Sequence, residues 1–401
     1  MISVDEARKL IFSQVSEWGV EEIPLIESVG RVLAQDIYAD RDFPPFDRVT
    51  MDGIALCFDS YQKGKRKFKV SGVQLAGEPS KTLADPWSAI EIMTGAILPS
   101  ECNLVIRYED LEFSEFKGER WVEILSNDAF EWKNVHRRAS DQKKGDLLIE
   151  KGAVLTSNII SIIATVGGNV VTVKKMPRVA VIATGDELVD VNETPKDYQI
   201  RKSNTATIEA ELTKRKVVFE SFHLLDDKEN LMTSISSILE DFDVLLLSGG
   251  VSKGKVDFLP DVLENLGVIK KFHKVRQRPG KPFWFGATSN QKTVFAFPGN
   301  PISTMMCFRV YFLEWLDKRI GIYRVSLKAK LMGEVNFKPN LSYFVQVRSE
   351  VSETGEIMVY PETGNGSGDL SNLSRSDAFL ELPENKTVFI SGEKYPYFSF
   401  T

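Results

Sequence analysis

Apolar runs alternate with helical patterns along the 401-residue chain between Arg178 and Arg319. The runs RVAVIAT, VVFESFHLL and DVLLLS have the character of buried strands, and each is followed by a stretch with helical spacing. Buried strands joined by helical crossovers are typical of a parallel sheet that is covered on both faces. We therefore predict a doubly wound, mostly parallel α/β domain over residues 175–322. Its helices are expected at about 204–214, 227–239, 259–266 and 301–319.

The remaining segments are expected to be mostly β. The breaker DFPPFD at 42–47 marks a boundary because its two prolines force an extended path. Short β-branched and aromatic runs follow it, and the segment at 143–173 is more similar in character to the N-terminal segment than to these runs. The predicted fold class is therefore α/β plus β, with several domains. They are a discontinuous N-terminal domain at 1–42 and 140–174, an inserted β-rich domain at 43–139, the α/β domain at 175–322, and a small C-terminal β domain at 323–401.

Charge and composition exclude several classes of protein. The net charge is −6 and no stripe of lysine and arginine stands out, so we expect no nucleic-acid partner. The capping box at Ser3 and Glu6 indicates a folded helix rather than a signal peptide. The most apolar later stretch, 158–173, is interrupted by Gly167 and Gly168 and is too short to span a bilayer, so we expect no membrane partner.

The cysteine and histidine content limits the possible metal chemistry. The three cysteines form no C-x-x-C pair and the three histidines are isolated, which disfavours a disulfide scaffold, a zinc site and a serine–histidine triad. The expected location is a reducing cytoplasm. A metal in this chain would therefore be held by carboxylates.

Three loops at the expected carboxyl ends of the strands carry unusual residues. The first is Thr184-Gly185-Asp186-Glu187, which two interpretations fit: a capped helix start, or a tight turn that brings two acids to a ligand. The second is SGGVSKGKVD at 248–257, in which adjacent glycines can form an anion-binding nest beside Ser248, Ser252 and Asp257. It is neither a dinucleotide-binding loop nor a P-loop. Tight packing alone would explain its glycines but not these polar residues.

The third feature is a pair of Pro-Gly turns at 278–282 and 297–303. Lys274, Arg278 and Lys281 bring three cations to one edge, where phosphate contact is a better explanation than a solvated surface. Several carboxylates near bound phosphates usually indicate Mg²⁺, which prefers oxygen ligands. The three loops therefore predict one shared pocket for a phosphorylated small molecule, with phosphoryl or nucleotidyl chemistry.

The order of the sequence blocks resembles that of the molybdopterin molybdenumtransferase family, which includes the MoeA-type enzymes and the E domain of gephyrin. The similarity extends over nearly the whole chain. The blocks are LIESVGRVLAQDI, PPFDRVTMDGIA, EIMTGAILP, ATGDEL, SGGVSKGKVD, RPGKP, FPGNPIS and TGNGSGDLSNLSRSDAFLELP.

The resemblance implies a reaction and an assembly. Members of the family insert molybdate into adenylylated molybdopterin with Mg²⁺ and release AMP, and the molybdenum becomes bound by the dithiolene sulfurs of the pterin. This would explain a metal-handling enzyme with few cysteines. Members are homodimers with an intersubunit active site, so Asp52 and Thr94 would act on the partner's α/β domain. The implied functional partner is a molybdopterin adenylyltransferase.

The resemblance also implies roles for particular residues. The polar catalytic set is Asp52, Thr94, Asp141, Glu187, Asp226 and Asp257. Three of these are the candidate Mg²⁺ ligands, namely Glu187, Asp226 and Asp257. The candidate substrate contacts are Gly185, Asp186, Ser203, Asn204, Ser248, Gly249, Gly250, Ser252, Gly254, Lys274, Arg278, Lys281, Pro298, Pro301, Arg348 and Ser367.

The chain departs from the family pattern at several positions, and alternatives stay open. The departures are Ile54, Cys102, Asn103, Ala139, Ser140 and Lys202. They suggest a divergent member of the family. One possibility is a paralogue that handles tungstate, since molybdate and tungstate are tetrahedral dianions of nearly equal size. A molybdopterin adenylyltransferase shares the SGGVS-type loop but lacks the β insert and the C-terminal β domain. A non-catalytic scaffold similar to gephyrin is a further alternative.

Overall fold

The computed structural model describes residues 1–83, 85–251, 258–362, 364, 366 and 368–400. The chain forms two compact units, one of residues 1–21 and 173–401 and the other of residues 22–172. It passes between them within β1 (Val20–Pro24) and β12 (Val170–Lys174), which pair with each other. The prediction of a multidomain α/β plus β protein is confirmed, and the finer division into four domains stays a prediction.

A six-stranded mixed sheet forms the centre of the first unit. Its strands, in spatial order, are β16 (Phe219–Leu224), β13 (Val179–Thr184), β17 (Val244–Ser248), β21 (Thr293–Phe297), β20 (Trp284–Ala287) and β18 (Ile269–His273). The first four are parallel, whereas β20 and β18 are antiparallel to their neighbours. Every residue of β13, β17 and β21 is buried, as the apolar runs in the sequence predict.

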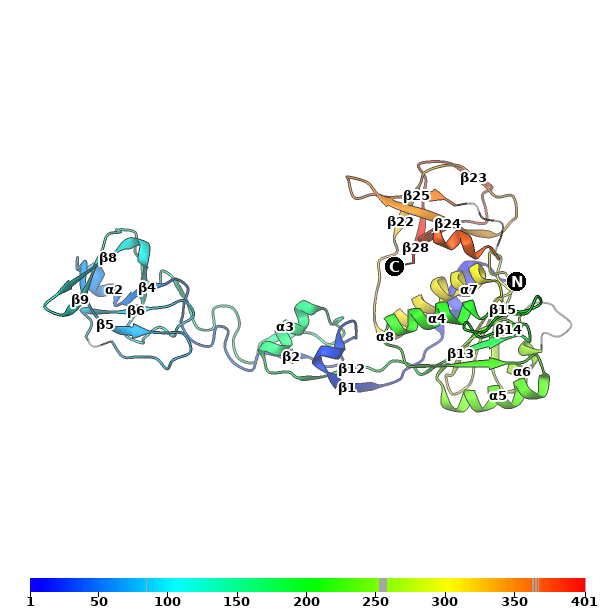
Figure 1. The fold of residues 1–401 in the computed structure, drawn as a ribbon, viewed down its shortest axis with the longest axis horizontal. Helices are drawn as coiled ribbons and strands as arrows, with labels where there is room; N and C mark the ends of the chain where they lie inside the picture. The colour runs from blue at the N-terminus through cyan, green and yellow to red at the C-terminus, as the bar shows by residue number, and fades with distance from the viewer. Residues whose placement is uncertain (84, 252–257, 363, 365, 367, 401) are drawn as a thin grey trace. The chain divides into compact units, whose positions relative to one another are not determined.

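Helices cover both faces of this sheet. They are α1 (Val4–Ser13), α4 (Ser203–Lys214), α5 (Lys228–Asp241), α6 (Leu259–Asn265), α7 (Pro301–Cys307) and α8 (Glu314–Ile320). Figure 1 shows α5 and α6 on one side of β13, and α4, α7 and α8 on the other. The side chains of α5 and α6 pack in one apolar core against the strands, with Leu231, Ile235 and Val262 almost fully buried. The doubly wound arrangement is thus confirmed.

The predicted long helix at 301–319 differs from the observed one. Helix α7 continues into the π-helical segment η3 (Phe308–Leu313), and α8 follows it directly. A π turn holds one extra residue, and such turns often lie near functional sites. Rings on this helix pack against the sheet, as in the contact of Phe312 with Phe295 at 5.4 Å between centroids.

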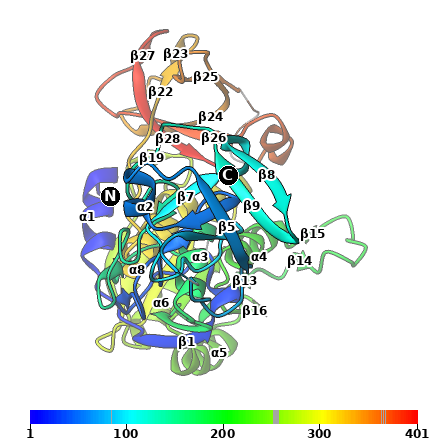
Figure 2. The ribbon, with the colours of Figure 1, turned by 90° about the vertical axis from the view of Figure 1, so that its left-hand side faces the viewer.

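The C-terminal part of the first unit is a small β domain. Its sheet contains β19 (Gln277–Arg278), β24 (Ser342–Val351), β25 (Ile357–Pro361), β22 (Lys328–Leu331), β28 (Lys394–Ser399) and β26 (Ala378–Leu382). Because β24 pairs with β26 as well as with β25, the strands close into a small barrel. Figure 2 shows these strands gathered together near β23 (Val335–Asn336) and β27 (Val388–Phe389). The short strand β19 belongs to the loop that precedes β20, so the α/β part supplies one strand of this sheet.

The second unit is built mainly from β-strands. Its main sheet has the order β7 (Leu104–Arg107), β4 (Gly53–Leu56), β6 (Ser88–Ile92), β5 (Lys67–Gln74), β9 (Glu119–Ile124) and β8 (Leu111–Phe116). Ile54 and Ala55 point to opposite faces and enter two separate cores, as the alternation along a strand requires. The smaller elements are η1 (Leu25–Ser28), β2 (Ile37–Tyr38), β3 (Arg48–Val49), α2 (Phe58–Gln62), η2 (Tyr108–Asp110), β10 (Val135–His136), β11 (Leu147–Ile149) and α3 (Ser157–Thr165).

No helix among the described residues is both long enough and apolar enough to cross a membrane.

Candidate functional site

A polar cavity of about 500 Å³ lies in the first unit at the carboxyl ends of the parallel strands. The chain runs from β13 to β16 on one side and then crosses back to β17 on the other side, so the strand order reverses at β13. Open α/β sheets bind ligands at such a point. The cavity is lined by Glu187, Ile200, Gln277, Arg278, Pro279, Gly280, Lys281, Pro282, Pro298, Gly299, Asn300, Ser303 and Leu341. Four of the predicted site residues are in this lining, namely Glu187, Arg278, Lys281 and Pro298.

Asn204 joins the strand ends behind this cavity. Its amide Nδ2 donates to the hydroxyl of Ser248 at 2.9 Å and to the carbonyl of Gly299 at 2.7 Å. One side chain at the start of α4 thus connects the end of β17 with the loop after β21. Ser203 is the first residue of the same helix, and its carbonyl accepts from Thr207.

Two buried oxygen atoms at these strand ends have no hydrogen-bond partner among the described residues. They are Oγ1 of Thr184, at the end of β13, and Oδ1 of Asn204. Such atoms are costly to bury without a partner, and they are typical of sites that accept a ligand or an ordered water. Thr184 is not among the predicted site residues, because nothing in the sequence shows that its hydroxyl lacks a partner.

Gly249 and Gly250 have positive φ values, +103° and +68°, directly after β17. A Cβ atom at Gly249 would lie 2.6 Å from the carbonyl oxygen of Thr184, so no larger residue fits there. The close approach of the two strand ends therefore requires this glycine. Ser252, Gly254 and Asp257 of the same loop lie outside the described residues.

The loop after β13 is held by its own polar side chains. The carboxylate of Asp186 accepts from the backbone N–H of Asp226 at 3.0 Å and fixes the loop that follows β16. His223 contacts the carbonyl of Gly185 through Nε2 at 2.9 Å. The side chain of Glu187 bends back over Gly185 and lines the cavity. A Cβ atom added at Gly185 would lie 2.5 Å from the carboxylate of Glu187. Two interpretations of this loop were open, a capped helix start and a tight turn that brings two acids to a ligand. The position of Glu187 at the cavity fits the second one, whereas Asp186 positions Asp226.

The cationic rim comes from the segment between β18 and β20. Arg278 and Lys281 are exposed, line the cavity and form no ion pair within the described part of the chain. Lys274 has a φ of +83°, an uncommon conformation for a residue with a side chain. Pro301 begins α7, and the carbonyl of Pro298 accepts from Thr304, so both prolines shape the rim.

Two further predicted contacts, Arg348 and Ser367, belong to the C-terminal domain. Arg348 lies on β24, where it is paired with Glu350 and its guanidinium lies 4.9 Å from the ring centroid of Tyr360. Ser367 lies outside the described residues.

Asp52 and Thr94 form one polar cluster within the second unit. The backbone N–H of Thr94 donates to Oδ1 of Asp52 at 2.6 Å. Hydrogen bonds from the backbone and the side chain of Thr94 lower the pKa of Asp52, so this carboxylate stays charged at neutral pH. Both residues are exposed and are available to a ligand.

Asp141 lies in a second polar chain of the same unit. Nε2 of His136 contacts its Oδ1 at 2.7 Å, and a guanidinium N–H of Arg48 donates to Nδ1 of His136 at 3.2 Å. Since a guanidinium only donates, Nδ1 accepts, and the neutral imidazole carries its proton on Nε2. The hydrogen bond from His136 is the main cause that lowers the pKa of Asp141. Sequence reasoning missed both Arg48 and His136, which showed no motif.

Most departures from the family pattern have structural roles. Ile54 is fully buried in one core of the β-rich unit, and Cys102 is buried in the other, where desolvation raises the pKa of its thiol to about 12. Asn103 caps α2 through a hydrogen bond from the N–H of Phe58 at 2.7 Å. Lys202 pairs with Asp190 at 2.6 Å.

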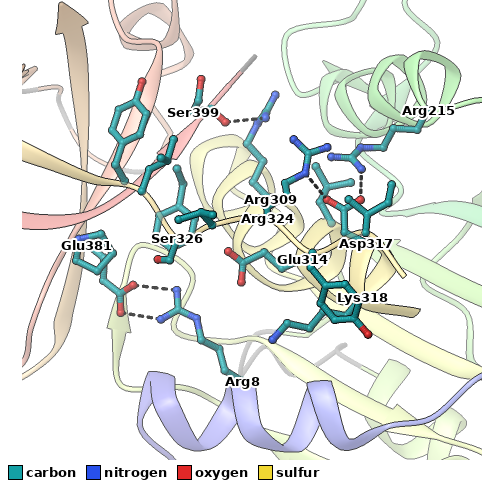
Figure 3. Close-up of a pocket in the computed structure, with 18 residues that line it drawn as sticks. Arg8, Arg215, Arg309, Glu314, Asp317, Lys318, Arg324, Ser326, Glu381 and Ser399 are labelled. Atoms are coloured by element: carbon teal, nitrogen blue, oxygen red, sulfur yellow. Dashed lines mark hydrogen bonds and ion pairs between the residues drawn. The ribbon is translucent and has the colours of Figure 1, made fainter. Parts of the chain in front are cut away.

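A second cavity in the first unit, of about 460 Å³, lies between α1, α8 and the C-terminal strands (Figure 3). Its charges are largely satisfied by each other: Arg8 pairs with Glu381 at 2.8 Å, and Asp317 pairs with both Arg215 and Arg324. It contains none of the predicted site residues. The cavity at the strand ends, whose two exposed cations have no acidic partner among the residues that the structure describes, is therefore the candidate site.

No group of three or more acidic, histidine or cysteine side chains that could hold a metal occurs among the described residues. Of the three predicted Mg²⁺ ligands, Glu187 lines the cavity, Asp226 lies in the adjacent loop and Asp257 is not described. A Mg²⁺ ion in such a site usually takes one or two carboxylates and completes its shell with phosphate oxygens and waters. Glu187, as the one predicted ligand in the described lining, is compatible with that pattern.

Family models match three successive parts of the chain. Residues 2–167 match the MoeA N-terminal region (domain I and II), 180–318 match a probable molybdopterin binding domain, and 328–400 match the MoeA C-terminal region (domain IV). The fold and the site thus define a molybdopterin-binding α/β domain with MoeA-type β domains attached to it.

Complete relatives show the same arrangement. A molybdopterin molybdenumtransferase of Synechocystis sp. is 38% identical over 403 residues, and the match covers 100% of both chains. One of Haemophilus influenzae is 30% identical and covers 98% of this chain and 97% of its own. A crystal structure of a molybdopterin biosynthesis MoeA protein from Pyrococcus horikoshii superposes with a TM-score of 0.84 at 30% identity and covers 100% of this chain and 99% of its own. The chain belongs to the molybdopterin molybdenumtransferase family.

Proposed function

We propose that this protein inserts molybdate into adenylylated molybdopterin, with Mg²⁺, and releases AMP. Family membership supports the reaction. The observation that carries the proposal to a site is the cavity at the strand reversal, which Arg278 and Lys281 line. The hydroxyl of Thr184, at the nearby end of β13, has no partner among the described residues and could donate to an anion. Such a combination suits a phosphate ester and an oxyanion.

Each group at this site would have a specific task. Arg278 and Lys281 would hold the adenylate phosphate and the molybdate dianion by charge-assisted hydrogen bonds. Ser248 accepts from Asn204, so its own hydroxyl hydrogen stays available for a phosphate oxygen. A carboxylate, Glu187 or Asp226, would orient a water toward phosphorus. As the new phosphorus–oxygen bond forms, the phosphate–pterin bond would break, so that AMP leaves with the water oxygen and the freed oxygen on the pterin side takes up the proton.

Glu187 and Asp226 are also the described residues that would hold Mg²⁺, together with Asp257. When bound, Mg²⁺ would neutralise charge on the phosphate oxygens. The undescribed loop residues Ser252 and Gly254, and Ser367 and Arg348 of the C-terminal domain, complete the proposed set of contacts.

We further propose that the protein acts as a homodimer with an intersubunit site, to which Asp52 and Thr94 of the partner subunit contribute. Helix α3 supports this assembly. It is rich in isoleucine, yet only Ile163 is buried, and Ile162 remains 41% exposed. Ile159 and Ile160 are partly buried, so α3 presents partly exposed apolar side chains that would suit a protein interface.

The substrate must already be adenylylated, so a molybdopterin adenylyltransferase is the proposed functional partner. The proposed location of both enzymes is the cytoplasm.

Molybdate-dependent AMP release tests this function. Purified protein is incubated with adenylylated molybdopterin, Mg²⁺ and molybdate, and AMP is measured by chromatography. We expect AMP release that requires molybdate. Lys281→Ala should lower this release about 10- to 100-fold through the lost charge contact. The control Lys271→Ala should leave it unchanged, because Lys271 is exposed and does not line the cavity. If AMP release does not depend on molybdate, the enzymatic function is rejected and a scaffold is favoured. If tungstate gives equal release, the assay does not distinguish molybdate from tungstate as the substrate.

A further inference from the structure

A fully buried polar network lies directly behind the cationic turn of the cavity. The hydroxyl of Tyr311 donates to Oε1 of Gln277, and Nε2 of Gln277 donates to the carbonyl of Gly280 at 2.9 Å. The same Nε2 lies 3.4 Å from the sulfur of Cys307. Gln277, Tyr311 and Cys307 have 0% exposure. None of these residues contains a charge that could take part directly in binding an anion.

The network is embedded in an aromatic core, where a polar side chain is costly unless it is paired. The ring of Tyr311 packs against Phe283 at 5.0 Å between centroids. An apolar residue in place of Gln277 would pack in the same space without a hydrogen-bonding requirement. The gain from the glutamine is therefore geometric: its side chain bridges the helix that follows β21 to the backbone of the turn.

The helix itself is shaped for this contact. Tyr311 lies within the π-helical segment Phe308–Leu313, which interrupts the α-helix. The wider π turn changes which residues face the sheet, and turns of this kind recur near functional sites. Here the segment presents the tyrosine hydroxyl to Gln277.

The turn is also held on its other sides. A Cβ atom at Gly280 would lie 2.7 Å from the Cys307 sulfur and 2.9 Å from Nε2 of Gln277, so the turn is packed onto the network without space. Gln277 and Arg278 form β19, which pairs with Ser342 and Tyr343 of the C-terminal barrel. The backbone that carries Arg278 and Lys281 is thus fixed between the helix and the barrel.

We propose that Gln277 and Tyr311 are a positioning pair that sets the affinity of the Arg278–Lys281 turn for a phosphate or oxyanion. The two cations flank the Gly280 carbonyl that Gln277 holds, so release of this carbonyl lets the turn relax and changes the spacing of the cations. Only the chemical nature of the ligand rests on the proposed function. The position of the pair rests on the contacts described above.

The test compares Gln277→Met, Tyr311→Phe and the double variant. Gln277→Met leaves the Tyr311 hydroxyl unsatisfied and removes the amide donor to Gly280, and Tyr311→Phe leaves Oε1 of Gln277 unsatisfied, so both variants should lose stability. The double variant removes the hydroxyl and Oε1 together and should regain part of this loss. In the double variant the Gly280 carbonyl lacks the amide donor of Gln277 and keeps the weak contact with the Cys307 thiol at 3.9 Å. We therefore expect orthophosphate and AMP, measured by calorimetry on the full chain, to bind about three- to tenfold more weakly to the double variant, the loss typical of one hydrogen bond.

Tyr61→Phe is the matched control. Tyr61 is a buried tyrosine whose hydroxyl donates to the carbonyl of Ser126 at 3.1 Å in the β-rich unit. Its loss should lower stability without a change in phosphate affinity. If the double variant regains wild-type affinity together with stability, or if all variants bind orthophosphate as the wild type does, the positioning role is wrong. If the double variant does not fold, Gln277→Met decides by the same affinity criterion, because it also removes the amide donor to the Gly280 carbonyl.

The outcome is separable from that of the proposed function. A wild-type protein that binds AMP and orthophosphate but releases no AMP from the adenylylated substrate would reject the reaction, and the affinities of the variants would still decide the role of the pair. In an active enzyme, the variants should raise KM more than they lower kcat, because the turn acts on binding.

Discussion

Replacement of Gly249 by alanine tests the tight approach of two strand ends beside the candidate site. Gly249 follows β17 with a φ of +103°, and an added Cβ would lie 2.6 Å from the carbonyl oxygen and 2.8 Å from Oγ1 of Thr184. The carbonyl is backbone at the end of β13, between two paired strands, so it cannot move aside cheaply. Both the conformation and the space thus oppose any side chain.

The magnitude follows from these two terms. A positive φ costs a residue with a side chain about 1–2 kcal/mol, and a forced overlap in a packed region costs about 1–3 kcal/mol. We therefore expect Gly249→Ala to lower the free energy of unfolding by about 2–5 kcal/mol. At about 2–4 °C per kcal/mol, the unfolding midpoint should fall by about 4–20 °C.

Gly267→Ala separates the two terms. Gly267 has a φ of +80° in the same unit, but nothing lies within 4 Å of its Cβ position, so only the conformational cost of about 1–2 kcal/mol applies. Urea and thermal unfolding followed by circular dichroism give both values, and calorimetry with AMP gives the effect on binding. Equal losses in the two variants, or unchanged AMP affinity in Gly249→Ala, would refute the reasoning that this glycine is required for the close approach at the ligand site.

Two further predictions concern the β-rich unit. His136→Ala should raise the pKa of Asp141 toward its ordinary value, as measured by NMR titration. Since the pKa of Asp141 is depressed in the folded state, its stabilisation is present above the unfolded-state pKa and is lost as pH falls through the folded-state pKa. The free energies of unfolding of variant and wild type should therefore converge in acid. A difference that stays constant with pH would contradict this. Ile162→Glu on α3 should dissociate the proposed dimer, whereas Thr165→Glu at the end of α3 should not. Light scattering gives the mass of each variant, and an unchanged mass for Ile162→Glu would place the interface elsewhere.

Sequence patterns predicted the features that depend on local chemistry. The apolar strands and their helical crossovers follow from periodicity, and the glycines at 249 and 250 follow from the need for positive φ beside a strand end. The place of three loops at the carboxyl ends of parallel strands then predicted that they share one pocket.

Features that depend on long-range packing were out of reach. The unpartnered hydroxyl of Thr184 and the bridge from Asn204 to Ser248 involve residues from different strands and helices. The link between Gln277 and Tyr311 spans 34 positions and passes through a π turn, which a 3.6-residue periodicity cannot reveal. His136 is isolated in the sequence, and its contact with Asp141 leaves no mark there.

The central claim is that the reaction takes place in the cavity at the strand reversal, and a crystal structure with AMP and molybdate tests it most directly. The account predicts the phosphate and the oxyanion beside Arg278 and Lys281, within reach of the hydroxyls of Thr184 and Ser248. Both ligands in the cavity between α1, α8 and the C-terminal strands, with the Arg278–Lys281 turn free of any anion, would contradict it.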